Sequence, residues 1–406
     1  MRILIVSQYF WPEHFIINDV VRMLHQQGHE VVVATGKPNY PDGEVFEGYR
    51  AWGCLREMYL NKIEVVRIPI WPRGVGGAKN LVLNYLTFVL AGVLCLPWLL
   101  RKREFDAIVV FAPSPITQAI PAILLKYLKK AKLFLWVQDL WPESLSATGF
   151  VKKPMLLKAV GWMVKAIYHH CDTLLVQSRA FIEPVRRYAK REKIFYYPNS
   201  IDAHAPATEQ DLPGELQALL DEHFCLVFAG NLGTAQALDV LVQAAIHLRD
   251  DPQIRLVLVG SGSRLGWLKA QQLAGGLDNL VLPGRFAAEL MPKIFERASA
   301  LLVSLNDDEI FAQTIPSKVQ AYLAAGRPII ASMNGEGARV IEEAEAGFTS
   351  SAEQVMPLVE NIRRMKMLDV SARASMGAAG KAYFDIHFEM ETQVRRLTEL
   401  LRRRPS

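Results

Sequence analysis

The chain is poor in cysteine. Its 406 residues include four, Cys54, Cys95, Cys171 and Cys225, and none has Cys-x-x-Cys spacing. Thiols scattered in this way exclude a disulfide framework and a zinc site of paired cysteines, so we expect reduced thiols in the cytoplasm. The first residues run directly into an apolar strand, Arg2–Val6, and lack the long apolar core of a signal peptide.

Internal repeats and low-complexity tracts are also missing. Hydrophobic residues make up 51% of the chain and charged residues 21%, which excludes intrinsic disorder and indicates a globular protein with large cores. A chain of 406 residues is too long for one ordinary core. We therefore expect two domains.

Charge is distributed unevenly. Residues 1–200 carry 26 Lys and Arg against 15 Asp and Glu, whereas residues 201–406 carry 20 against 26. A basic half suits a polyanion or an anionic membrane surface. No nucleic-acid-binding motif accompanies this charge, so we expect a membrane surface as the partner and no nucleic acid.

The longest apolar run is Leu81–Leu100, which contains no charged residue. Its length permits a membrane span. However, strand-like segments lie on both sides of it, at Glu64–Ile68 and Asp106–Phe111, and a span would divide their sheet across the bilayer. We therefore favour a buried helix or one that lies on the membrane surface.

Short apolar runs alternate with helical periodicity along the whole chain, which is typical of parallel sheets covered on both faces. Residues 199–222, rich in Pro, Ala, Asp and Glu, separate two such series and are expected to be a linker. The fold class is therefore α/β, with two doubly wound Rossmann-like domains. The expected strands are 2–6, 30–35, 63–68, 106–111, 133–137, 173–177, 194–197, 224–229, 255–259, 279–282, 300–304 and 328–331.

Ligands of doubly wound sheets bind beyond the carboxyl ends of the strands. In the second domain three strands end in turns that let backbone approach a ligand, a feature that also suits tight turns without a ligand. The dinucleotide fingerprint fails at Leu265, so we expect a mononucleotide diphosphate and neither NAD nor FAD as a cofactor. The turn residues predicted to bind it are Gly230, Asn231, Gly233, Gly260, Gly262, Arg264, Gly284 and Arg285.

The run Gln313–Pro328 predicts a short helix that begins at Pro316 and stops at Gly326. Lys318 falls in its first turn, where a cation opposes the helix dipole. A phosphate docked on the helix start would explain the lysine, and a buried helix with an outward-reaching lysine would explain it equally well. Gln313, Pro316, Ser317 and Lys318 are the candidate ligands of this segment.

In the first domain the strand 133–137 ends in Gln-Asp-Leu-Trp-Pro, which places Asp139 at the ligand edge of the sheet. Asp139 could orient an acceptor hydroxyl, or it could cap the next helix. Glu13 follows the first strand within an aromatic turn suited to sugar or lipid contact, or to packing alone. Asp139 and Glu13 are the candidate catalytic residues, and no metal site is predicted.

The chain resembles the family 4 glycosyltransferases of GT-B fold, and within them the WbuB-like, fucosamine transferase-like branch. The resemblance covers nearly the whole length. It is carried by Gln8–Glu13, Gly28–Val31, Lys37–Gly43, Asp139–Ser144, Ala229–Gly233 and Ile315–Gly326.

This resemblance implies two domains facing across a cleft. Residues 1–200 would bind an acceptor, residues 201–383 a nucleotide-sugar donor, and the helix within 384–406 would cross back to the first domain. The implied activity is a retaining, metal-independent hexosyl transfer from a UDP-linked sugar, such as N-acetylfucosamine, to an undecaprenyl-diphosphate-linked saccharide. Its expected place is the cytoplasmic face of the inner membrane, in O-antigen or exopolysaccharide synthesis.

Two acidic positions of the family pattern are missing here. Its paired glutamates fall on Gln313 and Ala321, and its phosphate-binding lysine falls on Gln236. We expect Lys318 to neutralise the diphosphate instead, with Arg264 or Arg285. A non-catalytic sugar-nucleotide-binding partner and a sugar-nucleotide epimerase of the same architecture stay open as alternatives.

Overall fold

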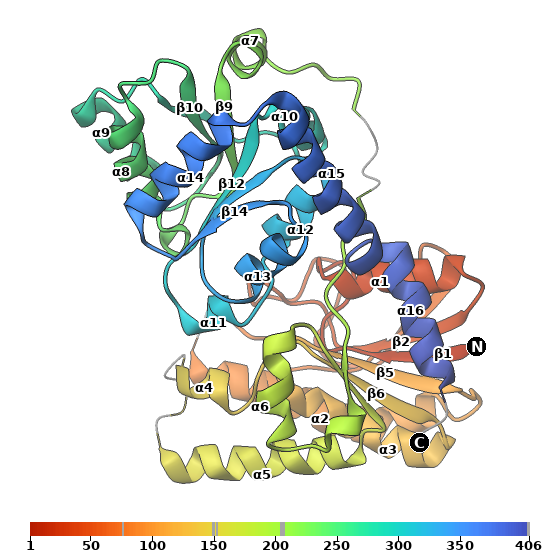
Figure 1. Cartoon of the computed structure of the whole chain (residues 1–406). Helices are drawn as coiled ribbons and strands as arrows, with labels where there is room; N and C mark the ends of the chain where they lie inside the picture. Colours follow the sequence, from red (N-terminus) through yellow and green to blue (C-terminus); the bar gives the residue numbers. More distant parts are fainter. Residues whose placement is uncertain (75–76, 148–150, 152, 204–207, 404–406) are drawn as a thin grey trace. The chain divides into compact units, whose positions relative to one another are not determined.

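The computed structural model describes residues 1–74, 77–147, 151, 153–203 and 208–403. The chain divides into two compact units (Figure 1). The first comprises Met1–Asn199 together with the described residues from Gln393 onward, and the second comprises Ser200–Thr392. Each unit is built on one sheet of its own.

The first unit holds an eight-stranded sheet in the order β3-β4-β2-β1-β5-β6-β7-β8. All neighbouring strands pair in parallel except the edge strand β3, which is antiparallel to β4. Its strands are β1 (Arg2–Val6), β2 (Glu30–Thr35), β3 (Leu55–Tyr59), β4 (Ile63–Arg67), β5 (Ala107–Ala112), β6 (Lys132–Val137), β7 (Thr173–Val176) and β8 (Ile194–Tyr196).

Helices cover both faces of this sheet (Figure 1). One face packs against α2 (Ala78–Leu99), α3 (Ala119–Lys129) and α5 (Pro154–His170) around a continuous apolar core. The other face carries α1 (Ile16–Gln26) and α16 (Met390–Arg402). The hydroxyl of Thr398 lies 3.3 Å from His29, and that of Tyr197 donates to the Gln393 carbonyl at 3.2 Å. The last helix is therefore part of the first unit.

The second unit has a six-stranded, fully parallel sheet in the order β11-β10-β9-β12-β13-β14. Two apolar cores fill its two faces. The strands are β9 (Phe224–Asn231), β10 (Ile254–Ser261), β11 (Leu280–Gly284), β12 (Ala300–Ser304), β13 (Ile329–Ser332) and β14 (Gly347–Ser350). The helices are α7 (Gly214–Glu222), α8 (Leu238–Leu248), α9 (Leu265–Gly275), α10 (Met291–Arg297), α11 (Glu309–Ala312), α12 (Ser317–Ala324), α13 (Glu336–Glu343), α14 (Val355–Met367) and α15 (Val370–His387).

Each of the twelve expected strands corresponds to a strand of the structure, within a few residues at its ends. Two strands, β3 and β14, were not expected. Exposure alternates along β3, because only one face of this edge strand is covered, but its residues Leu-Arg-Glu-Met-Tyr do not form the continuous apolar run of a buried strand. The expected linker 199–222 was wrong in part, because α7 occupies its end and buries Leu216 and Leu220 in the core of the second unit.

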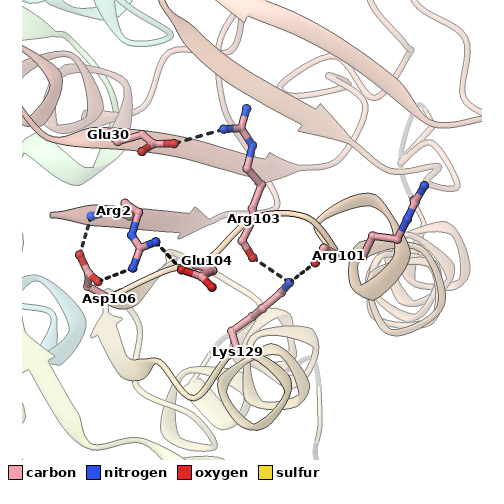
Figure 2. A network of polar contacts seen from close by, with 7 residues as sticks. All are labelled: Arg2, Glu30, Arg101, Arg103, Glu104, Asp106 and Lys129. Carbon is pink, nitrogen blue, oxygen red and sulfur yellow. Dashed lines mark hydrogen bonds and ion pairs between the residues drawn. The ribbon is translucent and has the colours of Figure 1, made fainter.

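Ion pairs join the amino ends of the strands in the first sheet (Figure 2). The Arg2 amide donates to Asp106 at 2.8 Å, and its guanidinium pairs with Glu104 at 2.6 Å. Arg103 pairs with Glu30 at 3.2 Å. These side chains are largely exposed, so each pair contributes little to stability. The amino ends of the strands thus carry these surface ion pairs. Ligands of doubly wound sheets bind at the opposite edge, beyond the carboxyl ends of the strands.

Gly260 is a position at which the backbone requires glycine. Its φ is +148°, and a Cβ there would lie 1.9 Å from the carbonyl oxygen of Gly230. We expect Gly260→Ala to lower the free energy of unfolding by about 3 kcal/mol, through backbone strain and overpacking. Gly266→Ala is the matched control, because its Cβ would meet open space within α9. Equal stability of the two variants in urea denaturation would contradict this account.

Candidate functional site

In the second unit, the carboxyl ends of β9 and β10 lie backbone to backbone. Gly260 pairs with Gly230, and Ser261 pairs with Asn231. A Cβ on Gly262 would lie 2.4 Å from the Leu232 carbonyl oxygen and 2.6 Å from Oδ1 of Asn231. The predicted glycine turns are thus brought together, and they present bare backbone at the ligand edge of the sheet.

The helix α12 begins beside this edge, with Pro316 as its N-cap residue. The ammonium of Lys318 donates to Oε1 of Gln236 at 2.5 Å and lies 3.7 Å from the ring centroid of Phe228. Its Cε would come within 2.9 Å of a Cβ on Gly230. The first turn of α12 therefore places a cation directly against the end of β9, where Gln236 accepts its hydrogen bond.

Burial lowers the pKa of Lys318 to about 7. No ion pair to a carboxylate is found for this ammonium within the described part of the chain. Lys318 is partly buried, and an amine without a counter-ion at such a position is suited to an anionic ligand, because an arriving anion favours the charged form. The helix start adds free amides and a favourable dipole at the same point.

The other predicted donor ligands differ in availability. Arg264 is committed to Asp239 by two hydrogen bonds of 2.8 and 3.0 Å. Arg285 follows Gly284 at the end of β11 and is exposed. Gln313 lies 3.5 Å from the Glu309 carboxylate, one turn earlier in the chain. Of the two arginines, Arg285 is thus the more accessible to a ligand.

Sequence reasoning did not find Tyr322 as a support of this site. Its hydroxyl accepts a hydrogen bond of 2.8 Å from the Ala229 amide, next to Gly230, and its ring is fully buried. It thereby fixes the end of β9 from the second turn of α12. Nothing in the sequence distinguishes it from a core aromatic residue. Among the described residues no three His, Cys, Asp or Glu are grouped to hold a metal ion.

In the first unit, Asp139 lies just after β6 as predicted. Nε1 of Trp141 donates to its carboxylate at 3.2 Å, and Ser144, Ser114 and the Leu140 amide lie close enough to lower its pKa. Burial raises the pKa of Asp139, and these donors oppose the shift. The carboxylate is held from several sides in a poorly solvated position.

An aromatic cluster adjoins Asp139. Tyr85 lies near Ser114, Tyr9 and Asp139, and all three affect its pKa, which burial raises. The guanidinium of Arg73 lies over the rings of Tyr9 and Tyr40, at 5.9 and 5.2 Å from their centroids, and donates to the Tyr9 hydroxyl at 3.3 Å. Tyr85, Ser114 and Arg73 come from three separate segments, so no local pattern in the sequence predicts that they lie together.

Glu13 occupies a different environment. Its carboxylate accepts hydrogen bonds from the amides of Asn39 and Tyr40, both at 2.8 Å, and of Phe10 at 3.1 Å. The side chain is 2% exposed. Burial raises the pKa of Glu13 to about 7, against the effect of the three amides. The geometry gives Glu13 the role of holding the loop 37–43 against the turn after β1.

Two family models match the chain. Residues 15–200 match the glycosyl transferase 4-like domain, and residues 223–366 match the glycosyl transferases group 1. Each half of the chain is a glycosyltransferase domain. The boundary between the two matches falls near the division of the structure into two units.

Similar proteins agree with this assignment. The chain is 25% identical to the putative colanic acid biosynthesis glycosyl transferase WcaI of Escherichia coli K12 over 347 residues, 80% of this chain and 82% of the relative. It is 25% identical to the probable glycosyltransferase WbjE of Pseudomonas aeruginosa over 280 residues, 67% and 69% of the two chains. The crystal structure of HepE from Anabaena in complex with UDP superimposes with a TM-score of 0.69 at 14% identity over 99% of both chains. The glycosyltransferase has the GT-B fold, as predicted.

The buried Lys318 makes the stability of this glycosyltransferase depend on pH. Above pH 7 the folded chain releases the proton that the unfolded chain keeps up to its ordinary pKa of 10.5, so the free energy of unfolding rises with pH in this window. Below about pH 7 both states are charged, and the cost of burial is fully present. We expect Lys318→Met to have a higher free energy of unfolding than wild type at pH 7. This difference between variant and wild type should become smaller by about 2 kcal/mol at pH 9.

Urea denaturation at the two pH values measures this gap. Lys269→Met, at an exposed position on α9, is the control and should show a constant offset. A gap between Lys318→Met and wild type that is independent of pH would contradict the burial of the charge.

The loop held by Glu13 provides a second prediction. Glu13→Gln replaces one acceptor oxygen by an NH₂ group and leaves at least one of three amides unpaired. We expect the free energy of unfolding to fall by about 1–3 kcal/mol, the cost of a buried unsatisfied donor. Glu47→Gln, exposed in the same region, should change stability by less than about 0.5 kcal/mol. Urea denaturation compares the two, and equal effects would reject the loop-holding role.

Proposed function

We propose that this glycosyltransferase transfers a sugar from a nucleotide-sugar donor to a lipid-linked saccharide. The donor is UDP-linked and of the N-acetylfucosamine type, and the acceptor is carried on undecaprenyl diphosphate. The setting is O-antigen or exopolysaccharide synthesis at the cytoplasmic face of the inner membrane, with peripheral membrane contact, and the branch is the WbuB-like one. Relatives named for colanic acid synthesis, and neighbours solved with UDP or UDP-glucose, support this proposal.

The single observation that carries the donor side is the environment of Lys318. A desolvated ammonium, the start of α12 and the bare turns after β9 and β10 meet at one point. A diphosphate supplies the negative charge that this arrangement lacks. We assign the diphosphate to Lys318 and the amides at the start of α12, with Arg285 as the second cation.

On the acceptor side we assign Asp139 to the hydroxyl that is glycosylated. The reaction breaks the bond between the anomeric carbon and the diphosphate oxygen and forms a bond from that carbon to the acceptor oxygen. The acceptor hydroxyl loses its proton, and UDP leaves with the electron pair. Lys318 stabilises the charge that develops on the leaving diphosphate. Asp139 positions the hydroxyl, and its raised pKa suits it to take up a proton.

Glu13 acts in this proposal through the loop 37–43. Its carboxylate holds the backbone of Asn39 and Tyr40, and the Tyr40 ring lies beside Tyr9 with a centroid distance of 5.7 Å. Glu13 is therefore assigned as a positioning residue of the acceptor pocket. The expected stereochemical course is retention, without a metal ion.

A second candidate function has one observation in its favour. The positions of the two family glutamates hold Gln313 and Ala321, which removes carboxylates that would hold the donor sugar and the ribose. A protein that binds a sugar nucleotide without transferring it would tolerate this loss. Incubation with labelled UDP-sugars and a lipid-linked acceptor distinguishes the two, because transfer to the lipid excludes a purely binding protein.

The donor assignment predicts how UDP affinity responds to Lys318. We expect Lys318→Ala to weaken UDP binding by about 1.5–3 kcal/mol, the range for a hydrogen bond to a charged group. Because bound diphosphate restores the ammonium, UDP affinity of wild type should also rise as pH falls from about 8.5 to 6.5, by up to about tenfold per pH unit. The same series in Lys318→Ala isolates this contribution from titration of UDP itself. Calorimetry checks both effects, and unchanged affinity in a folded variant would refute the role.

The acceptor assignment predicts a different pattern for Asp139. Asp139→Asn keeps the size of the side chain and lies in the other unit from the donor site. We expect UDP affinity to stay within about twofold of wild type and the transfer rate to fall about 100-fold or more, the range for general acid–base groups. Glu143→Gln, four residues later, is the control. A loss of UDP binding equal to the loss of transfer would contradict the separation of roles.

A further inference from the structure

Three of the helices on one face of the first sheet contain no acidic residue, although two short helices that pack into the same core carry Glu143 and Glu183. None of the residues of α2, α3 and α5 is Asp or Glu, whereas five are lysines. The helices α1 and α16 on the other face contain both signs of charge. In Figure 1 α2, α3 and α5 lie side by side beneath the sheet, with α5 outermost. We call the surface formed by α2, α3 and α5 the acid-free face.

The outer side of α2 is apolar along its length. Its exposed residues recur every four positions, which keeps them on neighbouring turns of the helix. Leu90 is 62% exposed, Leu94 74% and Trp98 64%. An exposed apolar strip of this length is rare on a soluble surface and marks contact with another apolar phase. The full strip is Val82, Leu86, Leu90, Leu94 and Trp98.

The inner side of α2 belongs to the core of the first unit. Phe88 and Leu96 are fully buried, and a Cβ on Gly92 would lie 2.6 Å from the Pro121 ring of α3. The buried Asn84 accepts a hydrogen bond of 2.6 Å from Gln8 and donates to the Trp71 carbonyl at 2.6 Å. Although α2 is the one helix among the described residues that is long and apolar enough to cross a membrane, crossing would break this packing.

The carboxyl end of α2 is fixed by Lys129 of α3. Its ammonium donates to the carbonyl oxygens of Leu100 at 2.7 Å, Arg101 at 3.2 Å and Arg103 at 2.8 Å. Figure 2 shows the Arg101 side chain pointing away from this network, and its guanidinium lies 4.4 Å from the Trp98 ring centroid. An aromatic ring beside a cation at the end of an apolar strip is typical of the polar–apolar boundary of a bilayer.

Further basic residues lie on α5, which packs against α3 as α3 packs against α2. Lys158 lies 5.8 Å from the ring centroid of Trp162, which is itself 68% exposed. Next to Trp162 is a groove of about 780 Å³ whose charged lining includes Lys165, Arg187 and Lys190. Glu143 pairs with Arg187 at 3.6 Å, so this arginine has a counter-ion of its own. No ion pair is found for Lys158, Lys165 or Lys190 in the described part of the chain.

We propose that the acid-free face docks on an anionic lipid bilayer, with α2 lying in the plane of the interface. The apolar strip enters the acyl boundary, and the lysines of α5 and its groove meet lipid phosphates. Charge selects this occupant, because the helices α2, α3 and α5 carry lysines and no carboxylate, and Lys158, Lys165 and Lys190 have no ion pair in the described part of the chain. The inference gives the peripheral contact of the proposed function a surface, but it does not depend on the transfer reaction.

Co-sedimentation of the full chain with vesicles tests the apolar strip. Wild type should bind vesicles of phosphatidylethanolamine and phosphatidylglycerol and bind phosphatidylcholine vesicles at least about tenfold more weakly. The double variant Leu90→Glu and Leu94→Glu should lose about tenfold or more in affinity for the anionic vesicles. Leu273→Glu with Met367→Glu makes the same charge change at exposed apolar positions of the second unit and should bind as wild type.

A second pair of variants tests the charges. Lys158→Glu with Lys165→Glu should weaken binding to anionic vesicles by about tenfold or more, and added salt should weaken wild type in the same direction. Lys269→Glu with Arg249→Glu, both exposed in the second unit, is the control. UDP binding, which requires neither lipid nor acceptor, should be unchanged in all four double variants. Because UDP is assigned to the second unit, a cooperative urea unfolding transition of each variant reports separately that the first unit is folded.

Three outcomes would overturn the proposal. One is equal vesicle binding by wild type and the α2 variant. Another is a wild-type dimer that Leu90→Glu with Leu94→Glu converts to a monomer while neither form binds vesicles, which would assign the strip to a second copy of the chain. The third is resistance to alkaline carbonate extraction after synthesis in the presence of vesicles, which would indicate a spanning helix. Loss of glycosyl transfer with vesicle binding intact would count against the proposed function alone.

Discussion

Each unit keeps one ionisable group largely out of water at the ligand edge of its sheet. The surrounding structure has to offset the cost of placing a charge there. In the second unit burial lowers the pKa of Lys318 to about 7, and in the first unit burial raises the pKa of Glu13 to about 7. Each group is held by its surroundings in a place where its charged form is costly. The glutamate is compensated by three amides of its own chain, whereas the lysine is offered one amide oxygen and the face of the Phe228 ring.

This difference separates scaffold from site. A buried group whose hydrogen bonds are satisfied within the chain stabilises one conformation, as Glu13 does for the loop 37–43. A partly buried cation whose partners are all neutral gains most from an anion that comes from outside. Both groups carry the cost of desolvating a charge. In the first unit partners within the chain offset this cost and hold a loop, whereas in the second unit a ligand has to offset it.

The sequence predicted the architecture well because buried parallel strands are continuous apolar runs, and all twelve predicted runs are strands. It failed at β3 and α7, where half-exposed residues dilute that signal. Among site residues, Lys318 was predictable because Pro316 and Gly326 mark the helix bounds. Tyr322, Arg73 and Ser114 were not, since their partners Ala229, Tyr9 and Asp139 are distant in the chain and meet them only in the folded protein.

The position of α16 has a consequence for the order in which the chain is completed. Its Val394, Leu397 and Leu401 are buried, and its contacts to His29 and Tyr197 close one face of the first sheet. During synthesis the first sheet is made long before this helix, so the face stays open to water while the whole second unit emerges from the ribosome. The glycosyltransferase thus finishes its first domain last, and a nascent chain that stops short of residue 393 presents an uncovered apolar surface to chaperones and proteases.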